Sequence, residues 1–218
     1  MTDTYRHKGL RKRMIDTLRR RGIADEAVLA AMSAVPRHFF LEKAFEEQAY
    51  EDKAFPIGCE QTISQPFTVA YQSALLEVKN RDRILEIGTG SGYQAAILAV
   101  LGARVFTVER QEGLYESAKN LLETLGFNTV RCFFDDGTRG LPRHAPFDKI
   151  LVTAGAPVVP ESLREQLAVG GLLVIPVGDE VQTMLKISRL SPAEYREERL
   201  DDFRFVPFLE GVSKTGDR

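Results

Sequence analysis

Residues 83–94 read RILEIGTGSGYQ, and this stretch decides the expected fold. The mostly apolar residues 84–87 predict a buried strand, and residues 93–101 predict a helix that packs back against it. Glycines at 88, 90 and 92 predict a tight loop between the two. Glycine suits such a loop because it adopts positive φ and leaves no Cβ between the backbone and a ligand. The helix that follows begins with unpaired N–H groups, which suit an anionic group.

The glycine spacing distinguishes two classes of ligand. A dinucleotide site typically has G-x-G-x-x-G around a pyrophosphate, whereas here every second residue is glycine and Tyr93 follows. Glu86, at the end of the strand, would repel a pyrophosphate but could receive an ammonium group. The loop therefore favours the methionine end of S-adenosylmethionine over NAD. A glycine-rich turn without a ligand is the alternative.

Strand-like and helix-like segments alternate after residue 101. Strands are predicted at 104–108, 129–134, 147–153 and 171–176, and helices at 114–125 and around 163–167. Such alternation is typical of an α/β fold with a doubly wound, mostly parallel sheet. Its ligand is expected at the carboxyl ends of the strands.

Both ends of the chain depart from this alternation. Residues 1–22 predict a very basic amphipathic helix, and Asp25 predicts the N-cap of a second helix. Together they predict a helical cap beside the sheet. Residues 184–187 and 203–206 predict two strands of an antiparallel hairpin at the sheet edge, with the polar residues 194–200 between them.

Acidic residues follow three successive predicted strands, at Glu86, Glu109 and Asp136. A carboxylate after the second strand can accept both hydroxyls of a ribose. Asp136, followed by Gly137, could reach an adenine amino group. Any one of these acids could simply be solvated, but three of them at matching positions beside the glycine loop favour a nucleoside ligand.

Residues 56–67 form the second informative stretch, which reads PIGCEQTISQPF. Thr62 or Ser64 could cap the helix that follows, which is the commonest task of such residues. Pro66 suits the first helical position, however, and this would make Gln65 the cap residue. Ser64 would then lie outside the helix with a free hydroxyl.

The 218 residues have the composition of a soluble globular protein, with 44% hydrophobic and 28% charged residues. The longest purely apolar run covers residues 95–101, so no membrane-spanning helix is expected. The basic N-terminus lacks the apolar segment of a secretory signal, which favours a cytoplasmic location. A net charge of −2 gives no overall attraction to nucleic acid. The two cysteines and three histidines lack metal-ligand spacing, so no metal is expected.

Three segments, 62–66 (TISQP), 85–94 (LEIGTGSGYQ) and 176–178 (PVG), resemble the protein-L-isoaspartate O-methyltransferase family. The resemblance runs over nearly the whole chain and includes the shorter matches at 35–37, 54–58, 147–148, 153–154 and 205–207. It implies a Rossmann-like class I methyltransferase fold and S-adenosylmethionine as the cofactor. It also implies methyl transfer to the α-carboxylate of L-isoaspartyl residues in damaged proteins. The methyl ester then closes to a succinimide without the enzyme, which begins repair.

The motifs and the resemblance together predict a set of site residues. Ser64 matches the family's active-site serine. The predicted cofactor-binding residues are Glu86, Gly88, Thr89, Gly90, Gly92, Glu109, Arg110, Asp136 and Gly137, and the predicted substrate-binding residues are Ile63, Ser64, Gln65, Val206 and Pro207. The sequence departs from the family pattern at two positions that bear on the adenine and substrate contacts. Asp135 replaces a glycine, and Gly155 interrupts an alanine run.

We expect one domain over residues 1–218, acting as a monomer. Its expected parts are a helical cap, an active-site loop and helix, a cofactor-binding core and C-terminal edge strands, at 1–50, 51–80, 81–180 and 181–218.

The chemistry needs no general base, because a substrate carboxylate with a reference pKa of about 4 is already ionised at neutral pH. Alignment of the reacting groups is then the main contribution expected from the protein. A nucleic-acid methyltransferase is one alternative, suggested by the basic first helix. Enzymes that methylate amino groups of bases often end the fourth strand with Asp or Asn, two prolines and an aromatic residue, whereas residues 153–156 read TAGA. A non-catalytic module that binds the cofactor or a peptide is the other alternative.

Overall fold

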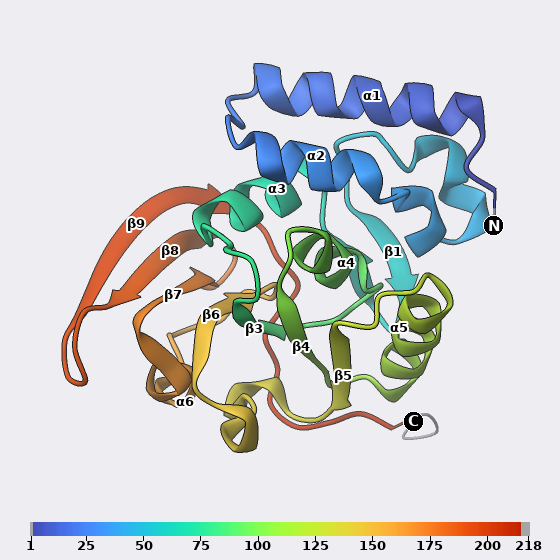
Figure 1. Cartoon of the computed structure of the whole chain (residues 1–218). Coiled ribbons are helices and arrows are strands. Elements are labelled where there is room, and N and C mark those ends of the chain that lie inside the picture. The colour runs from blue at the N-terminus through green and yellow to red at the C-terminus, as the bar shows by residue number, and fades with distance from the viewer. Residues whose placement is uncertain (1, 215–218) are drawn as a thin grey trace.

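The central sheet of the computed structural model has seven strands in the order β5-β4-β3-β6-β7-β8-β9 (Figure 1). Strands β5, β4, β3, β6 and β7 run parallel to one another. Strand β8 pairs antiparallel with β7, and β9 pairs antiparallel with β8. The bounds are β3 (Arg83–Ile87), β4 (Arg104–Glu109), β5 (Val130–Phe134), β6 (Phe147–Val152), β7 (Leu167–Val177), β8 (Gln182–Arg189) and β9 (Tyr195–Phe203). The structure describes residues 2–214. The doubly wound, mostly parallel sheet predicted from the sequence is confirmed. Because β4 and β6 flank β3 on opposite sides, the ligand crevice is expected at the carboxyl end of β3.

Apolar residues build a core on each face of this sheet. The helices are α1 (Tyr5–Arg20), α2 (Glu26–Ala34), α3 (Pro66–Leu75), α4 (Tyr93–Val100), α5 (Glu112–Thr124) and α6 (Glu161–Gln166), with 3-10 turns η1 (Arg37–Phe40), η2 (Lys43–Gln48), η3 (Gly137–Arg139) and η4 (Pro142–His144). On β3, Ile84 joins the core shared with α3 and α4, whereas Leu85 joins the opposite core with α6. Successive strand residues point to opposite faces, which explains this division.

Helices α1 and α2 pack over α3 and α4 and form the predicted cap (Figure 1). Leu18 of α1 and Leu29 of α2 belong to the same core as Ile97 of α4, so the cap shares its apolar interior with the sheet. Asp25 is the N-cap of α2, as predicted, and its carboxylate accepts the N–H groups of Ala27 and Val28 at 3.0 and 3.1 Å. No helix within residues 2–214 is long and apolar enough to cross a bilayer.

A polar cluster ties the start of the chain to the cap. Asp3 forms an ion pair with Arg11 at 2.8 Å, and His38 Nδ1 lies 2.7 Å from the Tyr50 hydroxyl. The rings of His7 and His38 lie against each other at a tilt, with their centroids 3.9 Å apart. Asp3, His7 and His38 place potential metal-ligating atoms within 4.8 Å of one another. The fixed guanidinium of Arg11 on Asp3 disfavours a metal ion there, so we regard the cluster as structural.

This cluster predicts that stability falls as the pH drops from about 7 towards about 5. Burial and the neighbouring His7 hold the pKa of His38 below its ordinary value, although Asp3 and Glu46 act in the opposite direction. The unfolded chain therefore binds a proton near pH ~6.5, whereas His38 in the folded chain binds its proton only at lower pH. Stability is lost as the pH falls through this range towards the folded pKa.

His38→Asn should flatten this decline, because its amide oxygen can still accept a hydrogen bond from Tyr50 but does not titrate. Thermal unfolding of the parent and the variant from pH ~8 to ~5 provides the measurement. Parallel pH profiles for the two proteins would show that His38 does not contribute.

The hairpin at the sheet edge differs from its prediction. The second strand is β9, Tyr195–Phe203, rather than 203–206, so the supposed polar connection over 194–200 forms most of the strand. Most side chains of β9 are exposed, and charged residues are typical of an edge strand that must avoid pairing with other chains. No apolar alternation is needed there, which is why the sequence pattern pointed to the wrong segment.

Candidate active site

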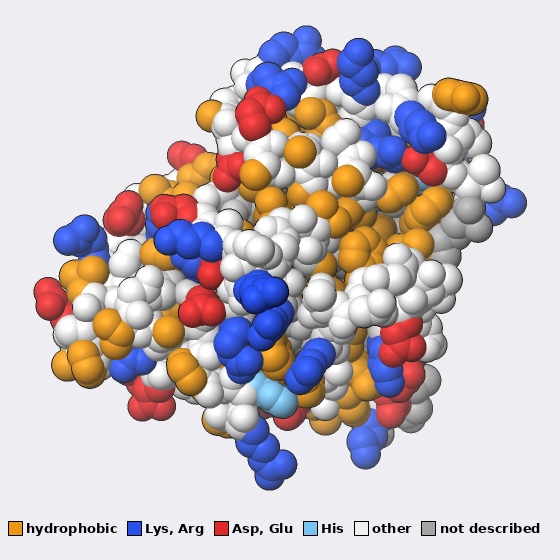
Figure 2. Space-filling view, in the orientation of Figure 1, with side chains coloured by type: hydrophobic (Ala, Val, Ile, Leu, Met, Phe, Trp, Pro, Cys, Tyr) orange, Lys and Arg blue, Asp and Glu red, His pale blue; other side chains and the backbone are white. Residues whose placement is uncertain are grey.

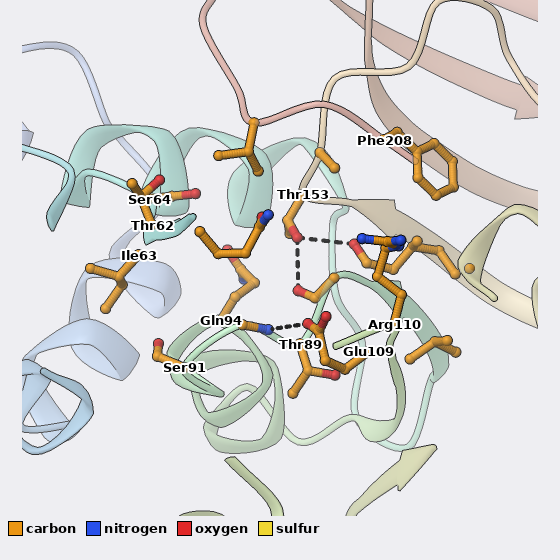
Figure 3. Close-up of a pocket in the computed structure, with 18 of the residues that line it drawn as sticks. Thr62, Ile63, Ser64, Thr89, Ser91, Gln94, Glu109, Arg110, Thr153 and Phe208 are labelled. Atoms are coloured by element: carbon orange, nitrogen blue, oxygen red, sulfur yellow. Dashed lines mark hydrogen bonds between the residues drawn. The ribbon is translucent and has the colours of Figure 1, made fainter. Parts of the chain in front are cut away.

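A cleft, here called the inner cleft, lies at the carboxyl ends of β3, β4 and β6. Its walls are residues 61–64, the glycine loop 88–91, residues 108–110 and residues 206–209. Figure 3 shows Thr62 and Ser64 on one side of this cleft and Thr89, Glu109 and Arg110 across from them. The crevice therefore lies at the carboxyl ends of the strands, as predicted, and where the observed strand order places it.

The glycine loop adopts a backbone that other residues would strain. Gly88, Gly90 and Gly92 have φ values of 94°, 52° and 86°. A Cβ at Gly88 would lie 2.5 Å from Thr153 Oγ1, which itself is 2.8 Å from the Gly88 carbonyl oxygen. Gly88, Thr89 and Gly90 line the inner cleft, whereas a Cβ at Gly92 would meet Leu122 of α5. The first glycines thus shape the cleft and the third permits close helix packing.

Glu109 ends β4 and secures the loop to the cleft wall. Its carboxylate accepts the N–H of Gly90 and the N–H of Gln111, both at 2.9 Å. Each carboxylate oxygen can accept a further hydrogen bond, so the side chain can still accept hydrogen bonds from both hydroxyls of a ribose. The neighbouring Arg110 lines the same wall, and its Nε donates to the Gly211 carbonyl at 2.9 Å.

Glu86 does not lie where the ammonium role would require. Its side chain is fully buried outside the cleft wall, with Oε2 2.5 Å from the hydroxyl of Thr107, the residue that faces it on β4. That hydroxyl lies 2.7 Å from Thr89 Oγ1 in the glycine loop. Burial raises the pKa of Glu86 to about 8, so the carboxyl is protonated at neutral pH. Glu86 therefore supports the loop from behind through two threonine hydroxyls.

Asp136 is buried beside the cleft, next to Gly137. Its Oδ1 accepts the backbone N–H and the hydroxyl of Thr138, at 2.9 and 2.7 Å, and so caps the turn η3. Gly137 lines the cleft in its place, and a Cβ there would lie 2.5 Å from Ile87 Cγ2. Asp135, one of the departures, accepts the N–H of Asp136 at 2.8 Å. Asp136 Oδ2 has no hydrogen-bond partner within residues 2–214, so the contact of this carboxylate with an adenine amino group stays a prediction.

Ser64 follows a short hairpin of β1 (Phe55–Gly58) and β2 (Gln61–Ile63), which the sequence did not predict. Gln65 occupies the N-cap position of α3 and Pro66 its first turn, as predicted, but no cap side chain bonds there. The carboxylate of Asp52 accepts the Phe67 N–H at 2.8 Å instead. Neither Thr62 nor Ser64 caps the helix. The Ser64 hydroxyl has no hydrogen-bond partner within residues 2–214.

A second cleft, here called the outer cleft, meets the inner cleft at Ser64. It lies between Ser64, Gln65 and residues 201–206, and Arg21 and Phe67 also line it. Both clefts share Thr62, Ser64, Thr153 and Val206, whereas Ile63 and Pro207 line only the inner cleft. Of the five predicted substrate-binding residues, Ser64 and Val206 lie at the junction of the two clefts, Ile63 and Pro207 line the inner cleft, and Gln65 lines the outer cleft.

Residues 205–213 cross the ends of the strands and close the inner cleft. The Gly155 N–H donates to the Val206 carbonyl and the Phe208 N–H donates to the Gly155 carbonyl, both at 2.8 Å. A Cβ at Gly155 would lie 2.8 Å from Cδ of Gln182, whose Oε1 accepts the Phe205 N–H at 2.9 Å, so glycine at this departure leaves room for a side chain that holds the segment. The sequence did not single out Thr153 or Phe208 as cleft residues. The pairing of β6 with β3 brings Thr153 to the glycine loop, and the folded C-terminal segment brings Phe208 to the cleft.

The family model for protein-L-isoaspartate(D-aspartate) O-methyltransferase (PCMT) matches residues 9–213. A protein-L-isoaspartate O-methyltransferase of Christiangramia forsetii is 54% identical over 210 residues, which cover 96% of this chain and 99% of the relative. A solved protein-L-isoaspartate O-methyltransferase superposes with a TM-score of 0.82 at 30% identity, over 90% of this chain and 65% of that chain.

A Plasmodium falciparum structure assigned to the same activity is in complex with S-adenosyl-L-homocysteine. It superposes with a TM-score of 0.81 at 25% identity and covers 91% of this chain and 98% of that chain. From these matches, which extend over nearly its whole length, it follows that the chain belongs to the protein-L-isoaspartate(D-aspartate) O-methyltransferase family.

Proposed function

We propose that this protein transfers a methyl group from S-adenosylmethionine to the α-carboxylate of L-isoaspartyl residues in damaged proteins and peptides. The observation that carries the proposal is the free hydroxyl of Ser64 at the junction of the inner and outer clefts. A cofactor in one cleft and a peptide in the other could meet only there. The family membership supports the same activity.

The inner cleft fits S-adenosylmethionine better than a dinucleotide. The loop at Gly88 and Gly90 brings bare backbone to the cleft, and Glu109 offers a nearly buried carboxylate to a ribose. Gly137 would leave room for the base. When bound, S-adenosylmethionine supplies a methyl group on a sulfonium, which an oxygen nucleophile can attack.

The residues at the junction align a nucleophile that is already ionised. A carboxylate with a reference pKa of about 4 needs no base at neutral pH. Ser64 would donate a hydrogen bond to this carboxylate and fix its direction, while Ile63 and Val206 exclude water from the junction. Well-oriented reactants reach effective molarities on the order of 10⁵ to 10⁸ M, so alignment is a sufficient source of rate.

The alternative of a nucleic-acid methyltransferase rests on the basic helix α1. Figure 2 shows Lys and Arg side chains gathered over the cap, with acidic side chains among them. Arg6, Arg19 and Arg21 form ion pairs with Glu47, Glu26 and Asp52, respectively. This pairing favours a solvated helix face.

The activity can be tested with labelled S-adenosylmethionine offered in parallel with an isoaspartyl peptide, its aspartyl twin and RNA. We expect label on the isoaspartyl peptide, little on the twin and none on RNA, and the product ester should be base-labile. Label on RNA alone would support the nucleic-acid alternative, and binding without any transfer would support the non-catalytic one.

We also propose that the protein acts as a single-domain monomer in the cytoplasm. The core shared by the cap and the sheet supports one domain. Sedimentation analysis would test the monomeric state.

A further inference from the structure

Arg37 is the largest fully buried side chain of the described residues, and it carries a charge without a carboxylate partner. Its Nε donates to the Ala49 carbonyl at 2.8 Å, and its Nη2 donates to the Ser64 carbonyl at 2.9 Å. Nη1 has no partner within residues 2–214. One guanidinium thus joins the cap to the residue at the junction of the two clefts.

The surroundings of Arg37 leave its positive charge uncompensated. No carboxylate of residues 2–214 lies within 4.0 Å of it. The guanidinium carbon lies 4.9 Å from the centre of the Tyr93 ring, which lines the inner cleft. Burial lowers the pKa of Arg37 only to about 10, so the group stays charged at neutral pH.

A buried charge of this kind is costly unless an opposite charge or strong hydrogen bonds compensate for it. In the same cap, the buried charge of Arg11 is compensated in the usual way, because its guanidinium forms an ion pair with the carboxylate of Asp3. Arg37 has only carbonyl oxygens and a π face. The missing partner and its contact with Ser64 point to a negative charge that arrives with the substrate.

We propose that Arg37 is the positioning residue for the substrate carboxylate, an inference that rests on the proposed function. Its hydrogen bond fixes the Ser64 main chain and so aims the hydroxyl. Its charge, one peptide group behind Ser64, favours an anion at the junction of the clefts. Arg204, which is exposed and lines the outer cleft, is the rival cation.

Two substitutions separate the charge of Arg37 from its size. Arg37→Gln keeps a donor but removes the charge, and it should raise the KM for an isoaspartyl peptide at least tenfold. Arg37→Lys keeps the charge and should raise this KM no more than threefold, while kcat falls because the Ser64 carbonyl is held less firmly. In both variants the affinity for S-adenosylhomocysteine, measured by calorimetry, should stay within threefold of the parent.

Arg204→Gln and Arg11→Lys are the matched controls. Arg11→Lys should lower Tm without changing the KM, and Arg204→Gln should raise the peptide KM clearly less than Arg37→Gln does if Arg37 is the cation. A tenfold higher KM in Arg204→Gln together with unchanged Arg37 variants would overturn the proposal. Loss of S-adenosylhomocysteine binding in both Arg37 variants would also overturn it, because Arg37 would then be needed for folding. A parent that methylates no isoaspartyl peptide would refute the proposed function itself.

Discussion

Ser64→Ala is expected to lower isoaspartyl methylation at least tenfold, which corresponds to about 1.4 kcal/mol of activation free energy. Its Tm should stay within a few degrees of the parent. The reason is that the Ser64 hydroxyl has no partner within residues 2–214 and faces both clefts, so its removal breaks no internal hydrogen bond. A hydrogen bond that strengthens in the transition state is lost in kcat or kcat/KM.

Asp52→Ala is the matched control for the capping role. Asp52 accepts the first free N–H of α3, and removing a cap typically costs about 1 kcal/mol of stability. We therefore expect a lower Tm for Asp52→Ala with kcat within threefold of the parent. The reverse pattern, with full activity and a lower Tm in Ser64→Ala, would make Ser64 a structural residue.

Glu109→Ala should weaken the binding of S-adenosylhomocysteine by roughly 1.5 to 3 kcal/mol, the usual contribution of hydrogen bonds to a charged group. This is on the order of tenfold to a hundredfold in Kd. The carboxylate is nearly buried, lines the inner cleft and holds the Gly90 N–H, so both a ribose and the loop lose an acceptor. NAD should not bind measurably to the parent or to the variant.

Glu109→Gln separates the two contributions of this carboxylate. Its amide oxygen can still accept the N–H of Gly90 or that of Gln111, but the negative charge is gone. Calorimetry should place its affinity between those of the parent and Glu109→Ala, and thermal unfolding should show a smaller loss for Gln than for Ala. Parental affinity in both variants would remove the ribose assignment.

Local sequence patterns predicted the elements that bury apolar residues or that require glycine. β3, the glycine loop and α4 were recognised because residues 84–87 are buried in the core and the glycines must adopt positive φ. β9 was misplaced because an exposed edge strand needs no apolar alternation. The N-cap position at Gln65 was also predicted, since proline at the first turn is a local signal.

The direction of individual side chains depends on partners that are distant in the sequence. Glu86 faces Thr107 because of the register between β3 and β4, and only this pairing turns the carboxyl into the core. Asp136 turns to cap η3, and the cap of α3 comes from Asp52 in a separate loop. The match at residues 35–37 marks Arg37 as part of the family pattern, but it does not show that the side chain is buried. These features follow from tertiary packing.

The segment 206–209 forms a wall of the inner cleft, and in chain order it follows every strand of the sheet. The strands from β3 to β8 can pair while this wall is still in the exit tunnel, since chains fold as they are synthesised. The nascent protein therefore has its sheet before it has a closed cofactor site. Ligand binding adds stability only to a state that binds the ligand, so the cofactor can stabilise this protein only after residues 206–209 have docked.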